Sequence, residues 1–230
     1  MTTINDLAII EEYKRFLNSE AFPCIAARAA LSKNQVQCWI ADNMACPKDD
    51  HAILQRIYDF VEDYRASEEP FHSLAIIFKG PNVNSEECFD AMMWQRLQAL
   101  RDLDSKLYPY DERVDADPAS PNFGFSLKEE SFFIIALHPA NSRAARKFTY
   151  PALVFNPHAE FEKLRNANRY EHMKRAVRKK DVLFSGSINP MLTDFGEQSE
   201  VYQYSGRTYD AQWKCPLSNN HSTDEHYSSS

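Results

Sequence analysis

The histidine at position 138 stands where a sequence could hold a metal-containing cofactor. It directly follows an apolar run, residues 132–137, whose length and composition predict a buried strand. A histidine at the end of a buried strand is held rigidly beside an apolar environment, as an axial ligand of haem iron must be. His138 is therefore the candidate iron ligand, and a hydrogen-bonded core histidine is the alternative interpretation.

Two arginines follow this histidine closely. Arg143 and Arg146 lie in the segment just beyond His138. A guanidinium group binds a carboxylate through two parallel hydrogen bonds, and a haem carries two propionate carboxylates. We therefore expect Arg143 and Arg146 to anchor the propionates of a haem b group.

Cys24 and His158 are the alternative iron ligands. Thiolate is the axial ligand in one class of haem oxygenases, and Arg28, four residues beyond Cys24, would lower the pKa of its thiol. A small buried apolar residue is the other interpretation of Cys24. His158 follows Pro157 at a predicted helix start, where a capping role is the alternative.

A long loop is predicted over residues 185–207, because three of the five glycines, Gly186, Gly196 and Gly206, fall within it. Long loops in compact domains are usually functional or disordered, and the aromatic residues of this one favour order. Its charged residues are candidates for binding a cationic substrate or for pairing with one another. The candidate substrate-binding residues are Asp194, Glu197 and Arg207.

Composition and charge exclude several classes of protein. The chain of 230 residues is 43% hydrophobic and 26% charged, as globular domains are, and its net charge of -7 argues against general affinity for nucleic acid or anionic membranes. Five cysteines without a Cys-x-x-Cys spacing predict reduced thiols in the cytoplasm. No apolar run has the length of a membrane span, and the first residues lack the pattern of a secretory signal.

The order of the predicted elements indicates an α+β domain with a mixed or antiparallel sheet covered by helices. Helices are expected over residues 5–18, 47–66, 85–107, 161–166 and 170–180, and strands over 36–40, 74–78, 123–127, 132–137 and 152–155. We expect one haem-binding catalytic domain over residues 1–216. The polar tail, residues 217–230, is expected to be disordered.

Many of these residues form an ordered series of motifs that resembles the YqcI/YcgG family from about residue 10 to 216, and most closely its guanitoxin-biosynthesis N-hydroxylase branch. The motifs are Phe22-Pro23-Cys24 with Ala27-Arg28, Leu137-His138-Pro139 with Ser142-Arg143 and Arg146, Pro151 with Leu153-Val154-Phe155-Asn156, Phe161 with Leu164-Arg165, Met173, Arg178, Asp181, Gly186-Ser187 with Asn189-Pro190-Met191-Leu192, Asp194 with Gly196, Gln203-Tyr204-Ser205-Gly206-Arg207, and Trp213 with Cys215-Pro216.

The resemblance implies a haem-dependent monooxygenase that hydroxylates a nitrogen of an arginine-like guanidine or amine, using dioxygen or peroxide and an electron donor. It places the proximal ligand at His138, and Ser187 and Asn189 are the candidate catalytic residues. The chain departs from the family pattern at Ser185, Lys180 and Ala26, which bears on substrate choice.

Two other functions compete with this one. A non-catalytic haem carrier or sensor would have an entirely apolar pocket, whereas an enzyme would place polar groups beside the haem. In a haem-free interaction protein the His138 motif would be only a structural turn. A visible absorption spectrum of the protein supplied with haem distinguishes the last hypothesis from the first two.

Overall fold

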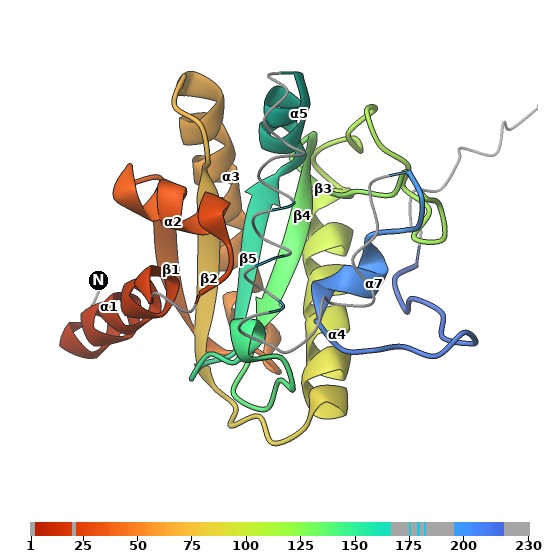
Figure 1. The fold of residues 1–230 in the computed structure, drawn as a ribbon. Helices are drawn as coiled ribbons and strands as arrows, with labels where there is room; N and C mark the ends of the chain where they lie inside the picture. Colours follow the sequence, from red (N-terminus) through yellow and green to blue (C-terminus); the bar gives the residue numbers. More distant parts are fainter. Residues whose placement is uncertain are drawn as a thin grey trace, which may run out of the picture.

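A computed structural model describes residues 3–19, 22–166, 175, 179, 182 and 196–218 of the chain. Its strands and helices are labelled in Figure 1. The strands are β1 (Val36–Asn43), β2 (Ser73–Gly80), β3 (Phe125–Leu127), β4 (Glu130–Leu137) and β5 (Ala152–Pro157). The helices are α1 (Ile4–Asn18), α2 (Ile25–Ser32), α3 (Asp50–Ala66), α4 (Glu86–Asp104), α5 (His158–Asn166) and α7 (Val201–Tyr204), with 3-10 turns η1 (Pro47–Asp49) and η2 (Ala144–Arg146).

Within the described residues the strands form one mixed sheet in the order β1-β2-β5-β4-β3. β1 and β2 are parallel, and the connection between them contains α3, as a parallel pair requires. The remaining neighbours are antiparallel. The α+β class predicted from the sequence, with a mixed sheet and covering helices, is confirmed.

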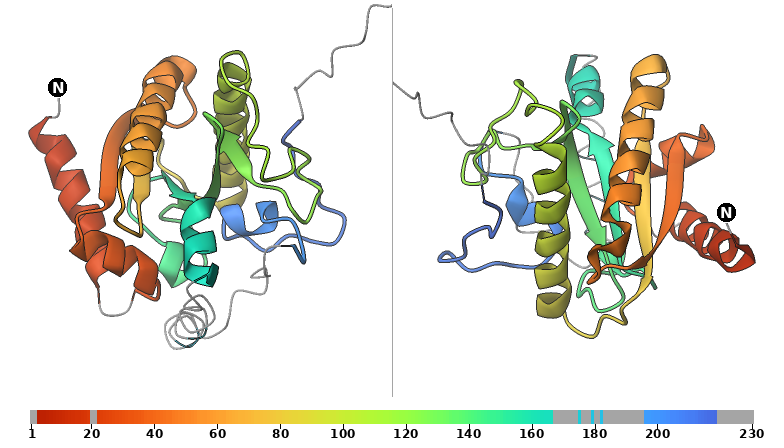
Figure 2. Two further views of the ribbon diagram at one scale, coloured as in Figure 1. Left: turned by 90° about the horizontal axis from the view of Figure 1, so that it is seen from above. Right: turned by 180° about the vertical axis from the view of Figure 1, so that it is seen from behind.

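Helices lie on both faces of the sheet (Figure 1, Figure 2). α3 and α4 pack on one face, and α1 and α2 lie over the other. Because successive strand residues point to opposite faces, β2 sends Leu74 and Ile76 toward α3 and α4 but Ala75 and Ile77 toward α1. Two hydrophobic clusters therefore share the same strands.

The hairpin between β3 and β4 is tighter than the sequence predicts. Only Lys128 and Glu129 form the turn, with φ values of 53° and 56°. Positive φ at both central residues is the backbone of a two-residue type I′ turn, whose twist matches that of the strands. β4 consequently begins at Glu130, a buried residue held by Arg113 at 2.9 Å, rather than at the start of the apolar run.

Helix α2 was not predicted. Its sequence, IAARAALS, buries only Ala30 and so carries no apolar periodicity. Pro23 precedes it, and the thiol of Cys24 caps its first turn by accepting a hydrogen bond from Ala27 N at 3.4 Å.

The ordered part of the chain continues past the boundary expected at residue 216. Leu217 is buried in the larger hydrophobic cluster, and Ser218 N donates to Gln98 Oε1 at 2.8 Å. An apolar side chain that fills a core site is fixed by that burial even when its neighbours are polar.

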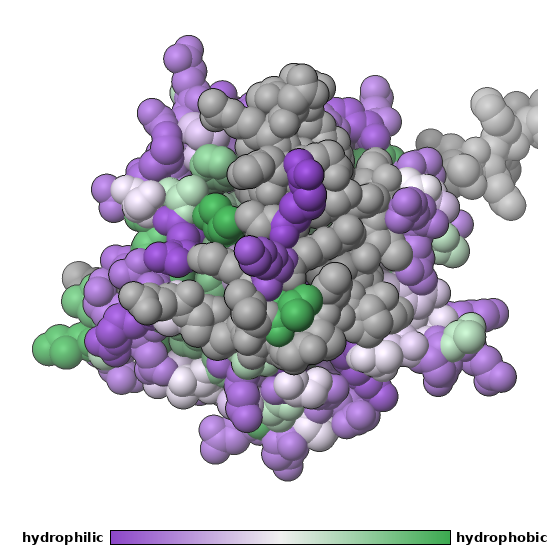
Figure 3. All heavy atoms as spheres, viewed as in Figure 1, coloured by the Kyte–Doolittle hydropathy of each residue, from purple (hydrophilic) through white to green (hydrophobic). Residues whose placement is uncertain are grey.

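The helix expected over 170–180 and the candidate residues Ser187, Asn189 and Asp194 lie outside the described residues, apart from isolated positions within that helix. Hydrophilic residues make up most of the described surface in the view of Figure 3. Within the described part of the chain, no helix combines the length and apolar character needed to cross a membrane.

Candidate functional site

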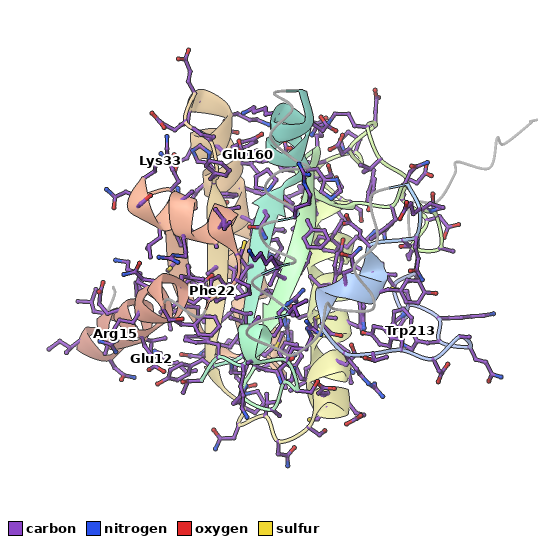
Figure 4. All side chains as sticks on the ribbon, viewed as in Figure 1. Glu12, Arg15, Phe22, Lys33, Glu160 and Trp213 are labelled. Carbon is purple, nitrogen blue, oxygen red and sulfur yellow. The ribbon has the colours of Figure 1, made fainter. Side chains whose placement is uncertain are left out.

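A cavity of about 230 Å³ lies on the side of the sheet that faces α1 and α2. Its walls come from segments far apart in the sequence, and Phe22 and Glu160, labelled in Figure 4, belong to two of them. The described residues that line it are Tyr13, Leu17, Phe22, Pro23, Cys24, Ala26, Ala27, Ala30, Val36, Phe71, His72, Ser73, Phe133, Ile135, Leu137, Arg143, Ala145, Arg146, Val154, Asn156 and Glu160.

The floor of the cavity is the apolar face of the sheet. β4 contributes alternate residues, Phe133, Ile135 and Leu137, because every second side chain of a strand points to the same face. Val154 of β5 lies directly opposite Ile135 in the antiparallel register. The floor therefore offers a dry surface to which a flat apolar ligand can bind.

Cys24 lies in the wall of this cavity at the amino end of α2. Burial raises the pKa of its thiol, opposed by hydrogen bonds from the backbone N–H groups of Ala27 and Ala26 and by the charge of Arg146. The pKa is thus shifted in the direction opposite to the one expected from a neighbouring Arg28, which does not line the cavity. The thiol is protonated at neutral pH unless a metal ion binds it.

The two arginines of the His138 motif both reach the cavity, but Arg146 is already engaged. Its guanidinium group donates to three backbone oxygens, those of Ala136 at 3.2 Å, Tyr204 at 2.8 Å and Gln203 at 3.0 Å. Arg143 lines the cavity from the residue before η2. Both predicted carboxylate anchors thus lie in the cavity wall, and Arg146 also ties η2 to β4 and α7.

His138 lies on the opposite side of the sheet from the cavity. Its ring is 1% exposed and stacks on Phe89 of α4, with ring centroids 4.1 Å apart. Asn141 Nδ2 donates to His138 Nε2 at 3.0 Å and also to Ser205 O, which leaves the ring proton on Nδ1. Leu137 occupies the cavity side, and the alternation of the strand turns the next residue away.

The structure therefore separates the predicted ligand from its predicted surroundings. Burial lowers the pKa of His138 to about 4, so the ring is neutral at neutral pH. Neutrality suits a metal ligand, but Nε2 accepts from Asn141 and the ring lies across the sheet from the apolar cavity. Of the predicted surroundings only Arg146 stays near the ring, since its charge helps to lower the pKa of His138. This geometry favours the core-histidine interpretation of His138.

Two of the predicted substrate-binding residues are also remote from the cavity lining. Arg207 pairs with Glu87 at 3.3 Å and Asp90 at 3.8 Å, on the α4 side of the molecule. Glu197 is exposed in the turn before α7. His158, the third candidate iron ligand, is the first residue of α5, and its Nε2 lies 2.8 Å from Glu200 Oε2.

A pair of polar residues that the sequence analysis did not select lies at one end of the cavity. His72 precedes β2 and Glu160 lies in the first turn of α5, and both side chains are almost fully buried. From the sequence, His72 is expected at an ordinary surface position on or near a helix, and this expectation is wrong: the residue is buried immediately before β2. The apolar strand that follows it is the signal for its burial, as the apolar strand before His138 is for that residue.

The described residues contain no cluster of three or more histidine, cysteine, aspartate and glutamate side chains that would hold a free metal ion. The fold and cavity together define an α+β protein with a largely apolar cavity on one face of its sheet.

The comparison with family models identifies the family. The model of the YqcI/YcgG family matches residues 13–218, and the chain therefore belongs to that family. Neither the search of curated proteins nor the search of solved structures returned a match.

Proposed function

We propose that this protein is a haem-dependent monooxygenase that N-hydroxylates a small guanidine- or amine-containing compound, as the resemblance to the guanitoxin-biosynthesis branch implies. The observation that carries the proposal is that Cys24 and Arg143, from distant segments, line one largely apolar cavity. A haem is held by a ligand to the iron, apolar walls and cationic side chains near its propionates, and Cys24, the apolar lining and Arg143 could supply these three features.

In this proposal Cys24, rather than His138, binds the iron. The thiol lines the cavity, whereas the His138 ring lies across the sheet with Nε2 bonded to Asn141. Iron binding removes the thiol proton, and the amino end of α2 and the charge of Arg146 favour the resulting thiolate. The burial that raises the pKa of the free Cys24 thiol is thus compatible with a thiolate bound to iron.

Arg143 is the proposed propionate anchor. It approaches the cavity from the turn after β4, on the same side as Cys24. Its guanidinium can donate two parallel hydrogen bonds to a carboxylate, which would fix the orientation of a bound haem as well as its position.

The cavity in this structure is smaller than a haem requires. At about 230 Å³ it lies below the roughly 300–1,000 Å³ usual for ligand pockets. A small substrate fits this volume, whereas a tetrapyrrole requires one wall to move outward. α2 is the wall that moves most easily, because it buries only Ala30.

A bound haem supplies the oxygen-activating chemistry that no side chain provides. In the overall reaction an N–H bond becomes N–O–H. With dioxygen, two electrons from the donor and two protons convert the second oxygen atom to water, and with peroxide no outside electrons are needed. The protein's part is to keep water out through the apolar floor and to orient the substrate nitrogen.

The polar end of the cavity favours an enzyme over a haem carrier. His72 and Glu160 place a buried imidazole and a buried carboxylate in the wall of an otherwise apolar space. Burying such groups costs free energy unless they bind something, and a carrier has no use for them.

The test is to supply the purified protein with haem and to incubate it with arginine, arginine analogues and cyclic guanidines. One series receives reductant and oxygen, and a second receives peroxide. Mass spectrometry should detect the gain of one oxygen atom, localised to nitrogen. Hydroxylation on carbon, or no oxidation across the panel by protein that retains haem, would move the assignment to the carrier.

A further inference from the structure

The imidazole of His72 is buried in the cavity wall with one nitrogen unused. The side chain is 5% exposed, and its ring packs edge-on against Tyr64. Nδ1 has no hydrogen-bond partner among the described residues. A buried polar atom without a partner is destabilising, so such an atom in the wall of a cavity indicates a place for a ligand.

A carboxylate stands beside this nitrogen. Glu160 Oε1 lies 3.9 Å from His72 Nδ1, which is too long for a hydrogen bond between them. The other oxygen, Oε2, accepts a hydrogen bond from Phe71 N at 2.5 Å and so fixes the carboxylate in place. Lys163 Nζ donates to Oε1 at 3.2 Å, but the lysine side chain is 55% exposed, so solvent screens its charge and a bound cation can replace it at that oxygen.

The 3.9 Å separation suits a shared donor. An atom at the usual distance of about 2.9 Å from each acceptor can contact both Nδ1 and Oε1 at once. A nitrogen that carries two hydrogens, as in a guanidinium or an ammonium group, is such a donor. The carboxylate also supplies the charge that attracts a cation, at a place where burial strengthens the attraction.

We infer that His72 and Glu160 form a binding subsite for a cationic nitrogen group, at the end of the cavity where β2 begins. The subsite is distinct from the loop acids that the sequence analysis selected. The inference deepens the proposed function, since it takes the cavity as the substrate site, but binding at this pair does not depend on haem.

The charge state of the imidazole agrees with this role. Burial is the largest influence on His72 and lowers its pKa, against the raising effect of Glu160. The ring is consequently neutral at neutral pH and can offer a lone pair to a donor. Around it stand Glu160, Lys163 and Glu69, of which only Glu160 lies in the cavity wall.

The test uses two small probes of the same shape on the haem-free protein, methylguanidine and methylurea. Both present NH2 groups, but only the first is a cation. Titration is followed by the NMR signals of the His72 ring, assigned by their loss in a His72→Asn variant. We expect saturable shifts and at least tenfold tighter binding of methylguanidine than of methylurea.

Two variants then locate the subsite. Glu160→Gln keeps an oxygen that can accept from Phe71 N but removes the charge, and should abolish the preference for methylguanidine. Glu162→Gln, an exposed neighbour on the same helix, is the matched control and should bind as the wild type does. If Glu160→Gln does not fold, His72→Asn serves instead. It lacks the reporter signals, so its binding is measured by calorimetric titration beside the wild type, and it should bind methylguanidine more weakly.

The inference is overturned if methylguanidine leaves the His72 signals unchanged, or if the folded Glu160→Gln or His72→Asn variant binds both probes as the wild type does. Failure of the proposed function has a different signature. In that case the NMR shifts persist, while the protein supplied with haem shows no haem spectrum or no oxidised product.

Discussion

At the residue scale, side chains alternate between the two faces of the sheet along a strand, and this alternation decides which of them reach the cavity. Leu137 and His138 are neighbours in sequence, but Leu137 lines the cavity and His138 stacks on Phe89 across the sheet. The motif Leu137-His138-Pro139 does not indicate which face of the sheet each of its side chains will reach. The sequence therefore predicted a rigid strand-end histidine correctly and could not predict the face on which it lies.

The buried His138 predicts a specific dependence of stability on pH. The pKa of His138 is about 4 in the folded protein, whereas the ordinary pKa of a histidine is 6.5. Between these values the unfolded chain binds the proton and the folded protein does not, so the free energy of unfolding falls as the pH drops from about 6.5 to about 4. The loss attributable to this residue should reach about 3 kcal/mol.

The measurement is urea unfolding of the wild type and of His138→Leu at several pH values. The comparison is needed because Asp104, with a pKa raised by burial to about 6, acts in the opposite direction in both proteins. The variant should be less stable at pH 7, by about 1–3 kcal/mol for the lost bond to Asn141, and the gap should narrow toward pH 4. A constant gap across this range would contradict the account of a buried, neutral ring.

At the element scale, the sequence predicted those helices and strands that bury a periodic set of side chains. Ser85, the first residue of the helix expected over 85–107, caps α4 by accepting a hydrogen bond from Cys88 N at 3.1 Å. α2 escaped prediction because a short alanine-rich helix with one buried residue has no apolar stripe. The omission matters for the site, since α2 carries Cys24 at its amino end.

Arg146 is predicted to hold elements together rather than to bind a ligand. Its three bonds to backbone oxygens connect η2 with β4 and α7. Gly206, at a φ of +79°, follows α7, and a Cβ atom there would approach Arg146 Cγ to 3.2 Å. The positive φ and the close aliphatic stem of Arg146 therefore both favour glycine at position 206.

Replacement of Arg146 by lysine should lower the free energy of unfolding by about 1–3 kcal/mol, since an ammonium group cannot reproduce the fork of bonds. Thermal unfolding would detect the change. Lys147→Ala is the control, because Lys147 is exposed and should alter the melting temperature little. Equal melting temperatures for Arg146→Lys and the wild type would show that these bonds contribute nothing to stability.

At the scale of the whole molecule, the site joins segments that the sequence keeps far apart. Cys24, Arg143 and Glu160 reach one cavity because β4 and β5 pair beneath it while α1 and α2 close over it. Periodicity predicts each element, but the order of strands in the sheet and the side on which each helix packs depend on long-range contacts. For this reason the sequence indicates the motifs but not which of them lie together around the cavity.

The central claim is that the cavity binds haem through Cys24, and a haem titration followed by absorption spectroscopy tests it most directly. The wild type should give a saturable complex with a thiolate-ligated spectrum. Cys24→Ser should lose that spectrum and bind haem at least tenfold more weakly, while His138→Leu, measured at a pH where it is folded, should match the wild type. A Cys24→Ser protein with the wild-type spectrum, together with loss of that spectrum in His138→Leu, would contradict the account.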